Sequence, residues 1–154
     1  MPLTDIISPD AVIPALKVSN KKQAIQELAA KAAALTGQSE QAIAEILFQR
    51  EKLGSTGVGG GIAIPHGKLP KLKSLFGMFA RLDRAIDFEA LDGQPVDLIF
   101  LLLAPEAAGA DHLKALARVA RLLRDGDVAH KLRESRDAAA LYSVLAIPSS
   151  ASAA

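Results

Sequence analysis

The chain has no cysteine and no tryptophan, and aromatic side chains make up only 4% of its 154 residues. Without cysteine, disulfide bonds, thiolate catalysis and cysteine-ligated metal sites are all excluded. The scarcity of aromatic rings argues against a surface that stacks nucleic-acid bases. The net charge is only +1, so charge gives no case for binding nucleic acid or an anionic membrane either.

Long hydrophobic runs are also missing. The longest, Leu98 to Ala104, is far shorter than the roughly 20 residues that a membrane-spanning helix needs. The N-terminal segment MPLTDIISPDAVIPAL has neither a basic region nor a long apolar core, so it does not look like a signal peptide. We therefore expect a soluble cytoplasmic protein with no membrane insertion.

Half of the residues are apolar, which is enough to build the core of one domain at this length. Apolar residues recur at helical spacing from Lys21 to about residue 36 and again from about residue 40 to 53. The expected N-caps are Ser19 or Asn20 for the first helix and Ser39 for the second, and the expected stops are Gly37 and Gly54.

The second half of the chain reads as strands followed by helices. Strand-like segments are expected at 62–64, 75–82, 85–88 and 96–103, of which the last, VDLIFLLL, is apolar enough for a central strand covered on both faces. Helices are expected at 110–124, 127–134 and 137–146, the last two capped by Asp127 and Asp137. Helix positions expected to be buried are Ile43, Ile46, Leu47, Leu53, Leu113, Leu116, Ala117, Ala120 and Leu123. Arg50 lies three residues after Leu47 and seven after Ile43, so we expect it to continue the inward stripe of its helix.

This order of elements predicts an α/β fold. We expect a single three-layer domain over residues 1–148, with a mixed β-sheet of about five strands flanked by helices. The small, polar segment SSASAA at 149–154 is expected to be a disordered tail.

The segment REKLGSTGVGGGIAIPHGK, residues 50–68, places His66 between Pro65 and Gly67, just after a glycine cluster. Proline fixes its own backbone φ, and glycine permits a close ligand approach. A histidine is neutral and nucleophilic near pH 7 because its ordinary pKa is about 6.5. One interpretation is a surface histidine presented for covalent chemistry. The other is a tight turn in which the imidazole only forms a hydrogen bond.

The two other histidines differ in setting. His112 begins a predicted helix, where unpaired backbone N–H groups attract anions and disfavour a charged imidazole. The competing interpretation places its ring partly in solvent with no function. His130 lies in a polar stretch, which is typical of a surface residue. A metal site built from His66, His112 and Asp111 stays a minor alternative, because no His-x-x-x-His pair is present.

The glycine-rich nucleotide motifs do not fit. Gly61 and Gly67 have one residue too many between them for a P-loop, and Leu69 follows Lys68 where Ser or Thr is needed. The dinucleotide fingerprint starting at Gly57 fails as well, since Ile62 occupies the third glycine position. The sequence therefore supports neither ATP nor NAD binding.

Anion chemistry remains. Basic, hydroxyl and glycine residues that suit a phosphate group cluster around His66. Against this stand the interpretations that Arg50 pairs with a carboxylate and that Lys68 is solvated. The candidate phosphate-binding residues are Arg50, Ser55, Thr56, Gly59, Gly60, Gly61, Gly67 and Lys68.

The segment REKLGSTGVGGGIAIPHGK closely resembles the phosphoacceptor segment of EIIA domains of the bacterial phosphotransferase system, in the fructose/mannitol class. DFEALDGQPVDLIFLLLAPE and DHLKALARVARLLRD resemble later parts of the same domain, so that the likeness covers roughly residues 5–145. The HGKL continuation and the free-standing length look most similar to the nitrogen-regulatory branch, EIIA-Ntr.

The resemblance implies a phosphocarrier. His66 matches the family's phosphoacceptor, His112 its second active-site histidine and Arg50 its nearby arginine. The donor would be an HPr-like protein (NPr), charged from phosphoenolpyruvate, so no cofactor would be needed. Regulatory targets would include potassium-transport or sensor-kinase components. The alternatives are a sugar-specific EIIA that feeds a fructose- or mannitol-type EIIB, a non-catalytic module that binds anions or proteins, and a metal-dependent hydrolase.

Overall fold

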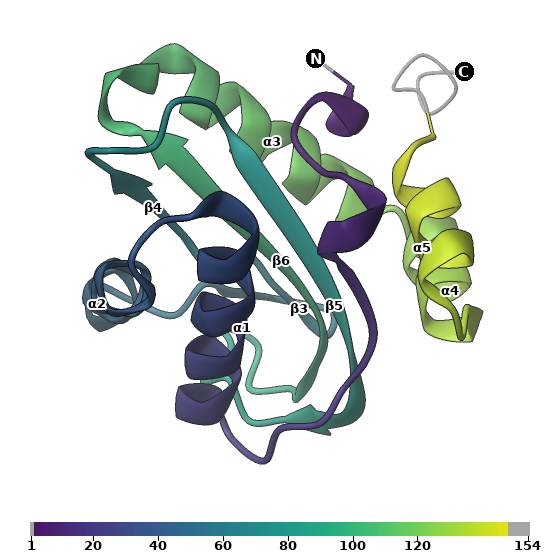
Figure 1. The fold of residues 1–154 in the computed structure, drawn as a ribbon. Helices are drawn as coiled ribbons and strands as arrows, with labels where there is room; N and C mark the ends of the chain where they lie inside the picture. Colours follow the sequence, from purple (N-terminus) through teal and green to yellow (C-terminus); the bar gives the residue numbers. More distant parts are fainter. Residues whose placement is uncertain (1, 148–154) are drawn as a thin grey trace.

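A computed structural model describes residues 2–147 of the chain (Figure 1). The predicted tail at 149–154 lies outside the described residues. Residues 2–147 form five α-helices: α1 (Lys21–Thr36), α2 (Glu40–Lys52), α3 (Ala110–Arg124), α4 (Gly126–Glu134) and α5 (Ala138–Leu145). The strands are β1 (Val12–Leu16), β2 (Gly57–Gly59), β3 (Ile62–Ala63), β4 (His66–Leu69), β5 (Phe76–Ile86) and β6 (Val96–Pro105). Short 3₁₀ turns, η1 (Leu3–Asp5), η2 (Pro9–Ala11) and η3 (Glu106–Ala108), precede β1 and α3.

The strands form one mixed sheet in the order β1-β5-β6-β3-β2, with β4 also paired to β6. The β5–β6 pair is antiparallel, whereas β1–β5, β3–β6 and β4–β6 are parallel. All residues of β6 from Leu98 to Ala104 are completely buried, as expected for a central strand with helices on both faces. The predicted fold class and the central position of this segment are confirmed.

The strands β3 and β4 follow one another along the same edge of β6. Ile62 pairs with Leu98 and His66 pairs with Leu102, so both strands keep the same offset of 36 residues (98 − 62 and 102 − 66). The Pro65 carbonyl accepts a hydrogen bond from the Leu102 N–H between the two strands. The chain therefore stays in register with the central strand as it enters His66.

Helices cover both faces of the sheet (Figure 1). Helices α1 and α2 lie side by side on one face, and α3 crosses the other behind β6. Helices α4 and α5 pack beside α3 and beyond β1. This is the three-layer arrangement predicted from the order of elements.

The predicted helix starts are mostly right. Side chains of Asn20, Ser39 and Asp137 accept hydrogen bonds from backbone N–H groups of α1, α2 and α5, as N-caps do. Gly37 ends α1 with φ +73°, a left-handed conformation that glycine adopts without strain. The cap predicted for α4 was wrong: Asp125, not Asp127, accepts the bonds from the first turn.

Three positions predicted to be buried are exposed: Leu53, Leu113 and Ala117. Leu53 follows the end of α2 and is 84% exposed, and Leu113 in α3 is 69% exposed. In α3 the buried positions include His112, Arg118 and Val119, so the buried face is turned away from the predicted leucine stripe. Counting only apolar residues misplaced that face, because a histidine and an arginine occupy part of it.

The strand predictions were incomplete. The predicted segments 75–82 and 85–88 are replaced by one strand, β5, which runs from Phe76 to Ile86 and so ends before residues 87–88; its register with β6 shifts between Arg81 and Ile86. Strands β1, β2 and β4 had not been predicted.

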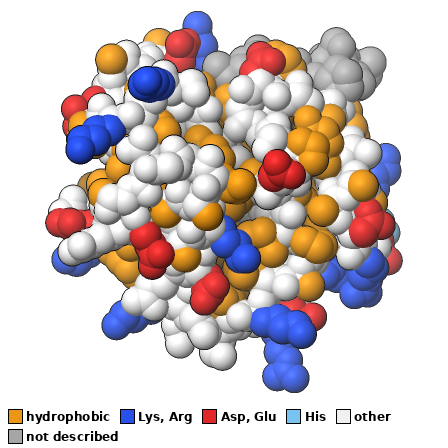
Figure 2. Space-filling model, in the orientation of Figure 1, with side chains coloured by type: hydrophobic (Ala, Val, Ile, Leu, Met, Phe, Trp, Pro, Cys, Tyr) orange, Lys and Arg blue, Asp and Glu red, His pale blue; other side chains and the backbone are white. Residues whose placement is uncertain are grey.

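Charged groups of both signs are interspersed with hydrophobic side chains on the face carrying α1 and α2 (Figure 2). Among residues 2–147, no helix is both long enough and apolar enough to cross a membrane.

Candidate functional site

His66 is the first residue of β4, where pairing with Leu102 fixes its backbone against the central strand. The ring is half-buried, and Nδ1 lies 2.9 Å from the Ile64 carbonyl oxygen. A carbonyl oxygen can only accept, so Nδ1 carries the hydrogen and donates it. The lone pair of the neutral ring is therefore on Nε2.

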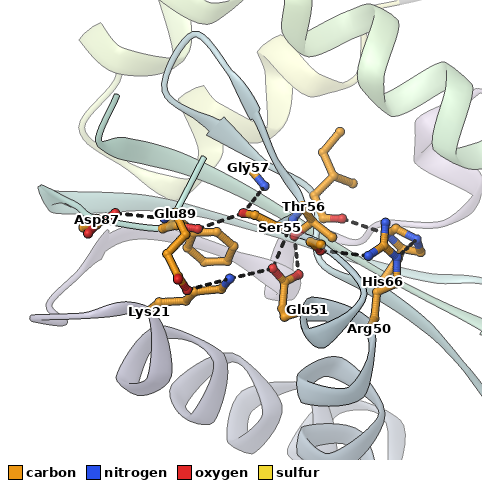
Figure 3. A network of polar contacts seen from close by, with 12 residues as sticks. Lys21, Arg50, Glu51, Ser55, Thr56, Gly57, His66, Asp87 and Glu89 are labelled. Atoms are coloured by element: carbon orange, nitrogen blue, oxygen red, sulfur yellow. Dashed lines mark hydrogen bonds and ion pairs between the residues drawn. The ribbon is translucent and has the colours of Figure 1, made fainter. Parts of the chain in front are cut away.

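Arg50 reaches His66 from the last turn of α2 (Figure 3). Its Nε donates to His66 Nε2 at 3.2 Å, and its Nη1 donates to the Gly54 carbonyl at 2.9 Å. Guanidinium nitrogens only donate, so this contact also requires the lone pair on Nε2. Two independent contacts thus agree on one tautomer. The predicted inward position of Arg50 on α2 is confirmed, although its partner is the imidazole and not a carboxylate.

His112 comes from the opposite helical layer, in the first turn of α3. Its ring centroid lies 5.7 Å from that of His66, with the planes at 67°. The residue is only 7% exposed, and its Nε2 has no hydrogen-bond partner in the described part of the chain. A buried polar atom without a partner costs free energy, and an oxygen of a bound group would satisfy it.

Both histidines are held in the neutral form. Burial lowers the pKa of His66, and the Arg50 charge lowers it further, while the Ile64 hydrogen bond and Glu51 act in the opposite direction. Burial also lowers the pKa of His112, with added repulsion from His66 and Lys68. Near pH 7 the site therefore offers a neutral nucleophilic nitrogen beside an arginine and a lysine.

Four further candidate phosphate-binding residues lie on β4 or in the loop after α2, and their contacts differ. Lys68 is exposed on β4, as the solvated interpretation expects, and its charge lowers the pKa of His112. Gly67 packs against α2, where an added Cβ would meet Ile46 Cδ1 at 2.7 Å. Ser55 binds backbone groups of Phe88 and Gly57, and Thr56 binds Glu51.

The three consecutive glycines do not lie at His66. Gly59, Gly60 and Gly61 all have positive φ angles and form the tight turn between β2 and β3. The Gly61 carbonyl accepts from Leu98, four residues before His66's partner Leu102, a separation of about 13 Å along a strand. Nearby side chains occupy the turn instead: Asp92 accepts from the Gly60 N–H, and Arg133 donates to its carbonyl.

Sequence reasoning missed Glu51, whose side chain is only 6% exposed and whose charge acts on His66. No motif singled it out among the 17 acidic residues of the chain. His130 is exposed, as predicted. Within residues 2–147, no three His, Asp or Glu side chains lie together in a way that could hold a metal ion.

The fold and the site define a class: a three-layer α/β domain that holds a neutral, half-exposed histidine among cationic groups. The sequence model of the family described as "Phosphoenolpyruvate-dependent sugar phosphotransferase system, EIIA 2" matches residues 5–147. The chain belongs to this family.

Relatives and solved structures agree with this membership. The chain is 74% identical over 148 residues to a protein of Bradyrhizobium diazoefficiens named "Nitrogen regulatory protein", covering 96% of this chain and 97% of the relative. It is similar to the crystal structure of nitrogen regulatory protein IIA-Ntr from Neisseria meningitidis, with a TM-score of 0.88, 34% identity and coverage of 93% and 98%.

A third likeness concerns the fold alone. Enzyme IIA mannitol of Escherichia coli, solved in complex with phosphorylated enzyme IIB mannitol, superimposes with a TM-score of 0.77 at 17% identity, covering 92% of this chain and 99% of that one.

Proposed function

We propose that this protein is a cytoplasmic phosphocarrier of a nitrogen-related phosphotransferase system. It accepts a phosphoryl group on His66 from an HPr-like donor, NPr, and regulates partner proteins according to its phosphorylation state. The family membership and the 74% identical nitrogen regulatory protein support the pathway. The observation that carries the chemistry is the tautomer of His66, which leaves the lone pair on Nε2 beside Arg50.

The proposed step is an in-line transfer between two proteins. The Nε2 lone pair of His66 attacks phosphorus, the P–N bond forms, and the donor's own bond to phosphorus breaks with its electron pair returning to the donor. The transferring group is metaphosphate-like, so positioning and positive charge supply most of the catalysis. The Ile64 carbonyl holds Nδ1–H and stabilises the charge that the ring gains.

Arg50 and His112 would bind the phosphoryl oxygens. Before transfer Arg50 donates to Nε2; as phosphorus approaches, its N–H groups turn to the oxygens of the incoming group. The unpaired Nε2 of His112 supplies a second contact if that nitrogen carries the hydrogen. No metal or nucleotide is needed in this scheme, because the phosphoryl group arrives on a protein.

The test is phosphorylation with phosphoenolpyruvate, the enzyme I homologue and NPr. Wild-type protein should gain one acid-labile phosphoryl group by mass spectrometry, and His66→Ala should gain none. His130→Ala, a substitution of an exposed histidine outside the site, is the matched control and should behave as wild type. Phosphorylation of His66→Ala at the wild-type rate would overturn the assignment.

His112→Ala separates the nucleophile from its neighbour. Loss of one preorganised donor in a comparable anion site lowers the rate about 10²- to 10³-fold. We expect the variant to fold and to be phosphorylated on His66 at a rate lowered by that order. An unchanged rate would remove His112 from the mechanism.

The second candidate is a sugar-specific EIIA, favoured by the family's description as a sugar phosphotransferase component. In that case phosphorylated protein would pass its group rapidly to a fructose- or mannitol-type EIIB. We expect NPr to be a better donor than the sugar-pathway HPr, and transfer to EIIB to be slow. The reverse pattern would favour the transporter role. Potassium-transport or sensor-kinase components, captured by only one phosphorylation state, would identify the regulatory targets.

A further inference from the structure

Glu51 is a nearly buried carboxylate directly after Arg50 in α2. Its side chain is 6% exposed, and it accepts hydrogen bonds from the Thr56 N–H, at 3.0 Å, and from the Thr56 hydroxyl. The Lys21 ammonium lies 3.0 Å from the same carboxylate. Burying a carboxylate costs free energy unless it is paired, and three partners offset that cost here.

The contacts of Glu51 continue to the imidazole of His66 through the backbone (Figure 3). Glu51 fixes Thr56; the Thr56 carbonyl accepts from the Ile64 N–H at 3.0 Å. The Ile64 carbonyl then accepts from His66 Nδ1 at 2.9 Å. This path, defined here as the Glu51 relay, runs through Thr56 and Ile64 and sets where the acceptor for Nδ1–H lies.

Hydrogen bonds of Arg50 link His66 and the turn after α2 to the same helix. Arg50, next to Glu51, donates to His66 Nε2 and to the Gly54 carbonyl in the turn that precedes Thr56. Arg50 thus binds the 53–56 turn at Gly54, and Glu51 binds it at Thr56. Two adjacent residues of α2 therefore hold both this turn and the imidazole. If the turn shifts, both ring contacts of His66 shift with it.

Resting on the proposed function, we propose that Glu51, with Lys21 as its counter-charge, is a positioning residue for phosphoryl transfer: it fixes the Nδ1–H tautomer and orientation of His66 through Thr56 and Ile64. It does not touch the phosphoryl group. Its role is to preorganise the His66 ring, in tautomer and orientation, before the donor protein docks.

Lys21 neutralises Glu51 from α1. Its ammonium group lies 4.9 Å from the centre of the Phe88 ring and 3.4 Å from the Glu89 carboxylate. The Lys21 side chain is 16% exposed, whereas that of Glu89 is 75% exposed, and within residues 2–147 the Glu89 carboxylate contacts only Lys21. Lys21 is therefore shared between a buried acid in the Glu51 relay and a surface acid outside it, and these two acids form a matched pair for substitution.

The first measurement needs no phosphoryl donor. Nitrogen-15 NMR of the His66 ring reports which nitrogen carries the hydrogen. Wild type and Glu89→Gln should show the Nδ1–H form. Glu51→Gln, which cannot accept from both Thr56 groups while pairing with Lys21, should show a mixture of tautomers. Unchanged ring shifts in a folded Glu51→Gln variant would overturn the proposal.

The second measurement is the single-turnover rate of transfer to His66 as a function of pH. Misplacement of a reacting group by about 1 Å costs about 10²-fold in rate, so Glu51→Gln should lower the plateau by about 10- to 100-fold. Burial lowers the pKa of His66 and the Ile64 hydrogen bond raises it, while among charged groups Arg50 lowers it and Glu51 raises it. His112 from α3 and Lys68 from β4 also face the site. Removing the Glu51 charge should therefore also move the acid limb of the profile to lower pH. Loss of the Glu51 charge would move the acid limb in either case, so the plateau decides: a carboxylate that served stability alone would leave it unchanged.

Two further variants keep the proposal testable if Glu51→Gln does not fold. Thr56→Val removes only the hydroxyl contact and retains the N–H contact, so we expect a smaller loss of rate. Lys21→Met removes the counter-charge of Glu51 and should lower the rate, with a double-mutant cycle showing coupling to Glu51 and none to Glu89. Wild-type rates in both variants would overturn the proposal. Failure of the wild-type protein to be phosphorylated would defeat the proposed function, while the NMR result would still decide the relay.

Discussion

Gly67→Ala is the substitution whose effect can be worked out most fully from the structure. Gly67 follows His66 in β4, and its φ is not among the positive ones, so alanine fits the backbone. The added Cβ would lie 2.7 Å from Ile46 Cδ1 and 3.1 Å from Ile46 Cγ1. Helix α2 must therefore yield or Ile46 must change rotamer.

Two terms of opposite sign set the magnitude. Overpacking of this kind costs about 1–3 kcal/mol, and replacing glycine by alanine returns about 0.4–1 kcal/mol by restricting the unfolded chain. We expect a net loss of about 0–2.6 kcal/mol in the free energy of unfolding, with each kcal/mol lowering Tm by roughly 2–4 °C for a domain of this size. Ile46 and Arg50 are four residues apart on one face of α2, so the displacement reaches Arg50 and should slow phosphoryl transfer as well.

The assay is urea and thermal unfolding of Gly67→Ala in two backgrounds. In wild type the substitution should destabilise. In Ile46→Ala, the remaining Ile46 Cβ position is 3.5 Å away, an ordinary contact, so the same substitution should be neutral or slightly stabilising. Equal destabilisation in both backgrounds would refute the reasoning, because the loss would then not come from Ile46.

Three other expectations follow from the structure. The acid limb of the pH–rate profile should be centred below 6.5, about the ordinary pKa of histidine, because burial and the Arg50 charge lower the pKa of His66; a limb centred above 6.5 would contradict this. Leu113→Ala should change the free energy of unfolding by less than about 0.5 kcal/mol and Leu123→Ala should lower it by about 2–5 kcal/mol in urea melts, because the first is exposed and the second buried. Asp125→Ala should cost about 1 kcal/mol of stability and Asp127→Ala much less in the same melts, because only Asp125 caps α4; equal losses would show that the cap is not decisive.

The sequence predicted correctly those elements whose ends or burial depend on residues close together in the chain. Asn20, Ser39 and Gly37 set helix ends by contacts within a few residues, and the apolar run of β6 needs no partner to be recognised. Strands β1 and β4 are different. β1 contains Pro14, which weakens any strand signal and suits its place at the end of the sheet order. β4, with the sequence HGKL, shows no alternation and is a strand because β6 lies beside it.

Some residues of the candidate site could also be predicted from the sequence, and others could not. His66 and His112 could be predicted because only three histidines are present, and Arg50 because its spacing from Leu47 placed it on the inward face of α2. Glu51 could not, since its role comes from Thr56 and Lys21, which reach it from a loop and another helix. The triple glycine was misleading for a physical reason: all three glycines have positive φ, and the close neighbours are side chains of this protein, Asp92 at Gly59 and Arg133 with Asp97 at Gly61.

The constant offset of β3 and β4 along β6 has a consequence for how this chain tolerates insertion and deletion. Only Ile64 and Pro65 separate Ala63 from His66, and both rows of pairing are already aligned. Losing or gaining one residue there would turn the imidazole to the other side of the sheet, and a change of two would move it by about 7 Å. Related chains that keep the chemistry should therefore vary in residue identity at 64–65 and not in length.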